Sequence, residues 1–123
     1  MPEPESMVSV VDREGVKVAR VKAGALLSEE DVELLGAALE RLAELPGQRV
    51  VLSFLGVTHI TSVVLRKLVE LHKRLEESGG ELRLADIDPH VYEMFAITRL
   101  DRMLRIYERE DEAIAGFLGA AEG

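Results

Sequence analysis

Two short runs rich in β-branched residues open the chain and predict a β-hairpin. Residues 7–11 (Met-Val-Ser-Val-Val) and residues 16–21 (Val-Lys-Val-Ala-Arg-Val) each have the composition of a strand. Residues 12–15 (Asp-Arg-Glu-Gly) lie between them and are typical of a turn. We therefore expect two antiparallel strands joined by a tight turn at the start of the domain.

A helix is predicted next, because apolar residues recur at helical spacing. Ser28 is the expected N-cap, and the three acidic residues after it suit the positive end of a helix. The helix is predicted to continue to Leu45, where Pro46 and Gly47 end it. The apolar positions that define its buried face are Val32, Leu35, Leu39 and Leu42.

Strands and helices alternate through the rest of the chain. Residues 50–54 form an almost unbroken apolar run, as in a central strand covered on both faces. A second helix follows and ends at Gly79-Gly80, then a strand at residues 82–85, a helix that starts at Asp88-Pro89, a strand at residues 104–107 and a terminal helix. The second helix has its apolar face at Leu65, Leu68, Leu71, His72 and Leu75, and the terminal helix at Ala113, Ile114, Phe117 and Leu118.

The element order β-β-α-β-α-β-α-β-α predicts an α/β fold. Alternating strands and helices imply right-handed crossovers, so we expect a mixed, mainly parallel sheet of about five strands with four helices. At 123 residues the chain has room for one domain. We assign that domain to residues 7–121 and interpret the proline- and glutamate-rich residues 1–6 as a flexible leader.

Composition narrows the classes of partner. The formal net charge of −8 disfavours binding to nucleic acid and to anionic membranes. The chain has no cysteine, which excludes disulfides and thiolate zinc sites. No apolar run approaches the ~18 residues that a membrane span needs. The acidic opening is unlike a signal peptide, so we expect a cytoplasmic protein without direct membrane insertion.

The sequence offers no catalytic constellation, so we do not expect an enzyme, a cofactor or a metal. It has neither a phosphate-binding P-loop nor a dinucleotide-binding glycine pattern. His59, His72 and His90 lack the spacing of zinc ligands. Ser62 lies close to His59, but a serine hydrolase also needs an orienting acid and an oxyanion hole. The structural interpretation of Ser62 is a helix N-cap.

Several motifs occur in an order that resembles the STAS domain family, and within it the anti-anti-sigma factors (anti-sigma factor antagonists). Residues 50–65 (Val-Val-Leu-Ser-Phe-Leu-Gly-Val-Thr-His-Ile-Thr-Ser-Val-Val-Leu) are similar to the family's buried strand, loop and helix start, which contain an Asp-Ser-Ser-Gly-Leu type motif. Residues 79–84 (Gly-Gly-Glu-Leu-Arg-Leu), Asp88-Pro89 and residues 100–107 (Leu-Asp-Arg-Met-Leu-Arg-Ile-Tyr) follow in the family's order. The resemblance covers nearly the whole chain.

The resemblance implies a partner-switching function controlled by Ser62. In anti-anti-sigma factors, an anti-sigma factor that is also a serine kinase phosphorylates the serine after the motif's aspartate and is thereby released, and a phosphatase restores binding. By position that serine is Ser62. The partner-binding residues that we infer are Leu26, Leu27, His59, Ile60, Thr61, Ser62, Val63 and Arg66. A homodimer is also compatible with the sequence.

Departures from the family motif leave a second function open. Thr61, Val63 and Val64 replace the aspartate, the second serine and the glycine of the motif, and Leu27 or Ala25 replaces an acidic residue before the first helix. If Leu27 and Val63 are neighbours, they form an apolar rim around Ser62 that would suit a protein partner. The alternative is therefore a constitutive, non-phosphorylated assembly subunit. Its partner would be an ABC lipid-transport ATPase or a stress-sensing complex.

Overall fold

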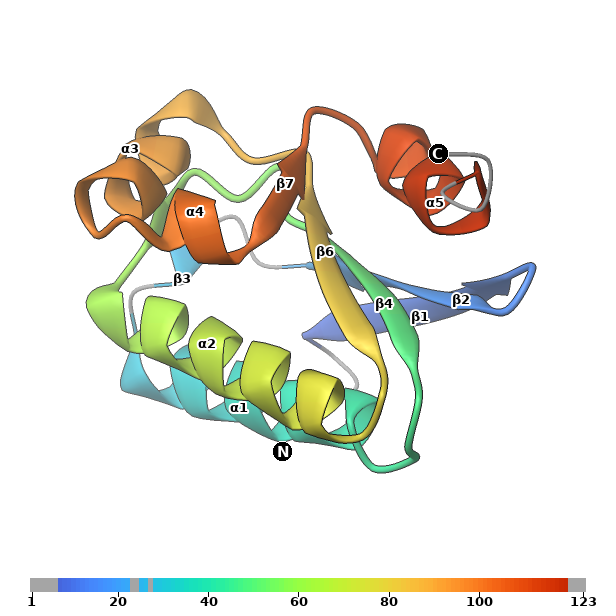
Figure 1. The fold of residues 1–123 in the computed structure, drawn as a ribbon. Helices are drawn as coiled ribbons and strands as arrows, with labels where there is room; N and C mark the ends of the chain where they lie inside the picture. Colours follow the sequence, from blue (N-terminus) through green and yellow to red (C-terminus); the bar gives the residue numbers. More distant parts are fainter. Residues whose placement is uncertain (1–6, 23–24, 27, 120–123) are drawn as a thin grey trace.

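A five-stranded sheet forms the centre of the molecule (Figure 1). The computed structural model describes residues 7–22, 25–26 and 28–119, and the strand order in the sheet is β1-β2-β4-β6-β7. Only the β1–β2 pair is antiparallel; β4, β6 and β7 join in parallel, which confirms the predicted sheet. The strands are β1 (Val8–Arg13), β2 (Val16–Val21), β4 (Arg49–Ser53), β6 (Glu81–Ala85) and β7 (Arg105–Tyr107).

Two further strands pair with each other outside this sheet. β3 (Ala25–Leu26) and β5 (His59–Ile60) run in parallel, with Leu26 opposite Ile60. A strand of two residues has no detectable alternation of apolar and polar positions, so neither was predicted from the sequence. Their pairing brings the segment before the first helix beside the loop that leads to Ser62.

The helices lie on both sides of the sheet. Figure 1 shows α1 and α2 together on one side and α5 on the other. The described residues contain one helix more than predicted. The additional helix is α4, a single turn that begins after Arg99, a residue in the left-handed conformation (φ 63°). The helices are α1 (Glu29–Leu42), α2 (Ser62–Glu77), α3 (Pro89–Ile97), α4 (Leu100–Met103) and α5 (Glu110–Gly119).

The first helix ends earlier than the apolar pattern suggests. Ala43 is the C-cap of α1, so the predicted extension to Leu45 is wrong. The amides of Ala43 and Glu44 bond to carbonyls three residues back, which is the tightening that ends a helix. Pro46 disfavours helical backbone at Leu45, whose side chain is 63% exposed.

Side-chain caps and glycines fix three helix boundaries as predicted: the starts of α1 and α3 and the end of α2. Ser28 Oγ accepts a hydrogen bond from the amide of Asp31, and the Asp88 carboxylate accepts one from His90. After α2, Gly79 has a φ of 85° and the Gly80 amide donates to the carbonyl of Leu75. That bond and the left-handed glycine form the helix end expected from Gly79-Gly80.

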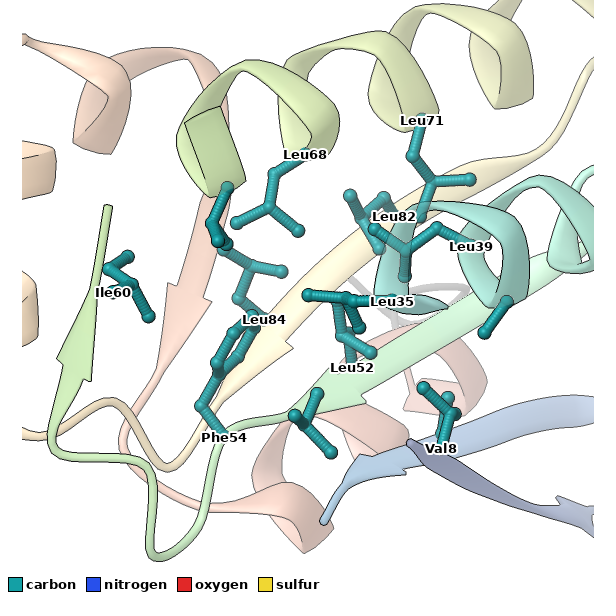
Figure 2. Close-up of a cluster of buried hydrophobic side chains, with 14 of the residues drawn as sticks. Val8, Leu35, Leu39, Leu52, Phe54, Ile60, Leu68, Leu71, Leu82 and Leu84 are labelled. Carbon is teal, nitrogen blue, oxygen red and sulfur yellow. The ribbon is translucent and has the colours of Figure 1, made fainter. Parts of the chain in front are cut away.

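The main core fills the space between the sheet and the α1–α2 layer (Figure 2). Phe54, Leu35, Leu52, Leu68 and Leu84 are completely or almost completely buried there. Each leucine that is fully buried contributes roughly 1.5–3 kcal/mol relative to an exposed one. This layer therefore sets the position of the α2 helix and, with it, of Ser62.

A smaller core and two polar contacts hold α5 on the opposite face. Phe117 and Ala113 pack on apolar side chains of the sheet. The guanidinium of Arg83 is 5% exposed and lies 4.1 Å from the centroid of the Phe117 ring. At the start of α5, Glu110 accepts two hydrogen bonds from Arg20, of 2.6 and 2.8 Å.

The predicted domain boundaries are only partly covered by these observations. Residues 1–6, interpreted above as a flexible leader, and residues 120–121 lie outside the described residues. None of the helices in the described part of the chain has the length and hydropathy to cross a bilayer.

Candidate functional site

The loop between β4 and α2 positions Ser62. Val57 donates a backbone hydrogen bond of 2.9 Å to Phe54, and Gly56 between them has a φ of 85°. Glycine suits this turn because its third position needs the left-handed region. Phe54 and Val57 are both fully buried, so the loop is anchored in the core at each end of the turn.

Thr61, not Ser62, is the N-cap of α2. Thr61 has an extended backbone (φ −106°, ψ 168°), and its carbonyl accepts from the amides of Val64 and Leu65. The prediction of Ser62 as N-cap is therefore wrong: Ser62 is the first residue with helical geometry. The Thr61 hydroxyl oxygen makes no cap bond and is buried without a hydrogen-bond partner.

Ser62 itself is exposed, and so are Val63 and Arg66 after it in the first turns of α2. Val63 is 38% exposed and Arg66 is exposed, whereas Val64 and Leu65 turn into the core. The exposed residues thus form a continuous surface at the start of α2. This surface contains an apolar side chain (Val63), a hydroxyl group (Ser62) and a cation (Arg66).

The electrostatic environment of Ser62 favours an anion. The first turn of α2 contains no acidic residue. The amides at the first positions of a helix lack acceptors within the helix, and the helix dipole adds positive potential there. Arg66 lies one turn after Ser62, at the spacing at which helical side chains meet.

The other predicted surface residues differ in their surroundings. His59 is exposed, and its Nδ1 lies 3.0 Å from the hydroxyl of Thr58. Ile60 is 6% exposed and packs in the main core, so its side chain does not form part of the surface. Leu26 is positioned by backbone pairing with Ile60. Leu27 lies outside the described residues, and the apolar rim that it was expected to form with Val63 stays a prediction.

The histidines do not assemble into a metal site or a catalytic site. His59 and His90 are exposed, while His72 is part of α2, with its Nε2 3.5 Å from Glu76 and its Nδ1 buried without a partner among the described residues. Within the described residues there is no group of three or more acidic, histidine or cysteine side chains placed to bind a metal ion. The His59 hydrogen bond goes to Thr58, and none joins it to Ser62.

A groove between α1 and α2 was not predicted from the sequence. It has a volume of about 370 Å³ and includes Lys67, Lys73 and Arg74 among its lining residues. Gly36 permits the end of the Lys67 side chain to approach α1 closely, because a Cβ there would lie 2.8 Å from the Lys67 Nζ. A glycine inside a helix is unfavourable by itself, and this was the sequence signal for a close approach at Gly36.

Comparison with known proteins identifies the family. The family model described as the STAS domain matches residues 8–113. The chain is 29% identical over 92 residues to the putative anti-sigma factor antagonist BtrV of Bordetella bronchiseptica, a match that covers 75% of this chain and 79% of that protein.

Solved structures show the same fold at lower identity. An anti-sigma-factor antagonist (STAS) domain protein from Planctomyces limnophilus has a TM-score of 0.79 and 23% identity, covering 89% of this chain and 95% of its own. The anti-sigma factor antagonist SpoIIAA in its unphosphorylated form has a TM-score of 0.69 and 18% identity, covering 91% and 96%. From the extent of the family match, the chain belongs to the STAS domain family.

Proposed function

We propose that the chain is a partner-switching adaptor of the anti-sigma factor antagonist type. It binds a regulatory protein, an anti-sigma factor that is also a serine kinase, through the surface around Ser62. Phosphorylation of Ser62 releases this partner, and a phosphatase restores binding. The observation that carries the proposal is the exposed Ser62 hydroxyl at the first residue of α2 in a STAS fold.

The geometry at the start of α2 supports a switch that leaves the fold intact. A phosphate on Ser62 adds about −1.5 to −2 charge at neutral pH. The free amides and the dipole of the helix stabilise that charge, and Arg66 lies within reach one turn later. The charge therefore alters the docking surface without lowering the stability of the helix.

The relatives support the class of partner. BtrV is described as a putative anti-sigma factor antagonist, and SpoIIAA is an anti-sigma factor antagonist described in its unphosphorylated form. An adaptor of this type acts on transcription, so the proposal places the chain in the cytoplasm. It also assigns the chain a binding role without catalysis of its own.

The docking surface in this proposal centres on four exposed residues. His59, Ser62, Val63 and Arg66 offer side chains to a partner. Thr61 contributes mainly through its backbone, since its hydroxyl oxygen is buried. The backbone of Leu26 adjoins this surface through the β3–β5 pairing, and the buried Ile60 side chain supports it from the core; Leu27 stays a predicted member of the surface.

Affinity capture with matched baits tests the proposal. Wild type, Ser62→Ala and Ser62→Asp would be used as baits in native lysate, with Met103→Asp as the control. Met103 is 44% exposed and lies near His72 and Glu76, toward the carboxyl-terminal end of α2, so it controls for added charge away from Ser62. We expect the same partner on wild type, Ser62→Ala and Met103→Asp, and its loss from Ser62→Asp. Equal capture by all four baits would contradict control by charge at Ser62.

One observation favours the second function, a constitutive assembly subunit. Val63 exposes an apolar side chain beside Ser62, and the position before Ser62 holds Thr61 in place of the motif's acid. An ABC lipid-transport ATPase or a stress-sensing complex would then be the stable partner. This function predicts a complex that survives phosphatase treatment and does not change with Ser62→Asp.

A further inference from the structure

Within the described residues, the outer edge of β1 is open to pairing with another strand. β1 is the first strand of the sheet, and among the described strands only β2 pairs with it. The two strands match over six consecutive residue pairs without a bulge. Natural edge strands are usually protected by proline, by a bulge or by a charge in the middle. Residues Ser9, Val10 and Val11 provide none of these.

The hydrogen-bond pattern shows which backbone groups face outward. The amide of Lys22 donates to the carbonyl of Met7 over 2.8 Å, so this residue pair is a hydrogen-bonded one. Hydrogen-bonded and non-hydrogen-bonded pairs alternate along antiparallel strands. Ser9 and Val11 therefore bond to β2. The N–H and C=O groups of the residues between and beside them, at positions 8, 10 and 12, point to the open edge.

An apolar groove adjoins this edge. It has a volume of about 230 Å³ and lies between β1 and the carboxyl-terminal end of α1. Val10 is 49% exposed and Leu45 is 63% exposed, although both are aliphatic. The groove is lined by Val8, Val10, Lys17, Ala38, Arg41, Leu42, Leu45 and Gln48.

We propose that a second copy of the chain occupies this edge, with the two β1 strands antiparallel across a twofold axis at Val10. This register pairs Val10 with Val10 of the other copy, and Val8 with Asp12. It uses all three outward-facing residues of each strand, whereas a shift by two positions would leave one of them unpaired. The two sheets join into one continuous sheet, and the Val10 side chains meet on the face that carries the groove.

Local charge favours a second copy over a charged partner. The hairpin residues Asp12, Arg13, Glu14 and Lys17 sum to zero charge, although the chain has a net charge of −8. In the proposed register Asp12 lies opposite Val8 and Arg13 opposite Met7, so no like charges oppose each other. Because the groove is at the carboxyl end of α1 and Ser62 is at the start of α2, the dimer leaves the proposed docking surface free.

Cysteine cross-linking tests the register directly, because the natural chain has no cysteine. Val10→Cys would place two thiols opposite each other across the axis, with Cα atoms about 5.5 Å apart, which a disulfide can span. Asp12→Cys is the control, since its two copies would lie roughly 13 Å apart, at about 3.4 Å per residue. We expect rapid formation of a disulfide-linked dimer only for Val10→Cys. Equal rates for the two variants would overturn the register.

Sedimentation equilibrium tests the dimer itself. We expect wild type to approach twice 13.6 kDa as its concentration rises, and Val10→Lys to remain at 13.6 kDa. Leu55→Lys is the control because Leu55 is 74% exposed in the loop between β4 and α2 and does not belong to the β1 edge, and it should behave as wild type. Thermal melts would establish that each variant is folded. A wild-type monomer at millimolar concentration, or a Val10→Lys dimer, would overturn the proposal.

Discussion

At the scale of single residues, the start of α2 is unusual because the side chain of its N-cap residue, Thr61, makes no hydrogen bond to the helix. The Thr61 hydroxyl oxygen is buried and unpartnered, whereas Ser28 at the start of α1 makes the standard side-chain bond. An unsatisfied buried hydroxyl lowers stability. The proposed function gives this a rationale, because an uncapped helix start leaves its amides available for a phosphate on Ser62.

Replacement of the N-cap should therefore raise stability. In Thr61→Asp the carboxylate can accept from the free amides and favours the helix dipole, so we expect the free energy of unfolding to increase by about 1 kcal/mol. Urea denaturation at neutral pH would measure it. The control is Ser28→Ala, which removes a working cap and should lower stability by about 1 kcal/mol. A loss of stability in Thr61→Asp would show that the helix start is already satisfied.

Among the described glycines, Gly80 leaves the least room for a side chain. A Cβ at this position would lie 2.2 Å from the carbonyl oxygen of Gln48, and a backbone atom cannot move aside easily. We expect Gly80→Ala to lower the free energy of unfolding by about 1–3 kcal/mol. Gly36→Ala is the contrast, because it meets only the flexible end of Lys67 and gains helix propensity of about 1 kcal/mol. Equal effects in urea denaturation would contradict this difference.

At the scale of elements, α5 is held to the sheet by an ion pair as well as by apolar contacts. The hydrogen bonds from Arg20 lower the pKa of Glu110, and burial partly opposes this effect. A carboxylate whose pKa is depressed in the folded state stabilises the fold above its unfolded pKa. That contribution is lost as the pH falls below about 4.5, the ordinary value, and through the lower folded pKa.

Neutralisation of Glu110 should thus have a pH-dependent effect. We expect Glu110→Gln to lower the free energy of unfolding by roughly 0.5–1 kcal/mol at pH 7, a modest value because the Arg20 side chain is 43% exposed. The difference from wild type should shrink in acid as the wild-type carboxyl becomes protonated. Urea denaturation across this pH range measures both. Glu108→Gln, at an exposed acid just before this helix, is the control, and a pH-independent deficit in Glu110→Gln would contradict an ionic origin.

At the scale of the whole molecule, the layers of helices and sheet could be predicted from the sequence, because each long buried element has a clear apolar pattern. The leucines of α1 and α2 recur at helical spacing, and the apolar run of β4 defined a central strand. The positions of α4, β3 and β5 were not predicted, because a helix of one turn and strands of two residues have no measurable period. The contact of Arg83 with Phe117 could also not be predicted, since it joins segments that are far apart in the sequence.

The sequence predicted where the candidate site lies, but not how the individual side chains in it are arranged. The motif placed Ser62 at the start of a helix, and the structure puts its side chain on the surface there. The choice of Thr61 as N-cap depends on the backbone angles of a single residue, and the burial of Ile60 depends on how the loop packs. Neither is encoded in the local pattern of the sequence.

Binding of a site-specifically phosphorylated chain tests the central claim most directly. Phosphoserine would be incorporated at position 62, or at the exposed position 103 as the control, and the affinity of each for the captured partner measured by calorimetry. We expect at least a tenfold loss of affinity, about 1.4 kcal/mol, for the chain phosphorylated at Ser62 and none for the control, with the same melting behaviour in both. Unchanged affinity after phosphorylation of Ser62 would contradict the switch.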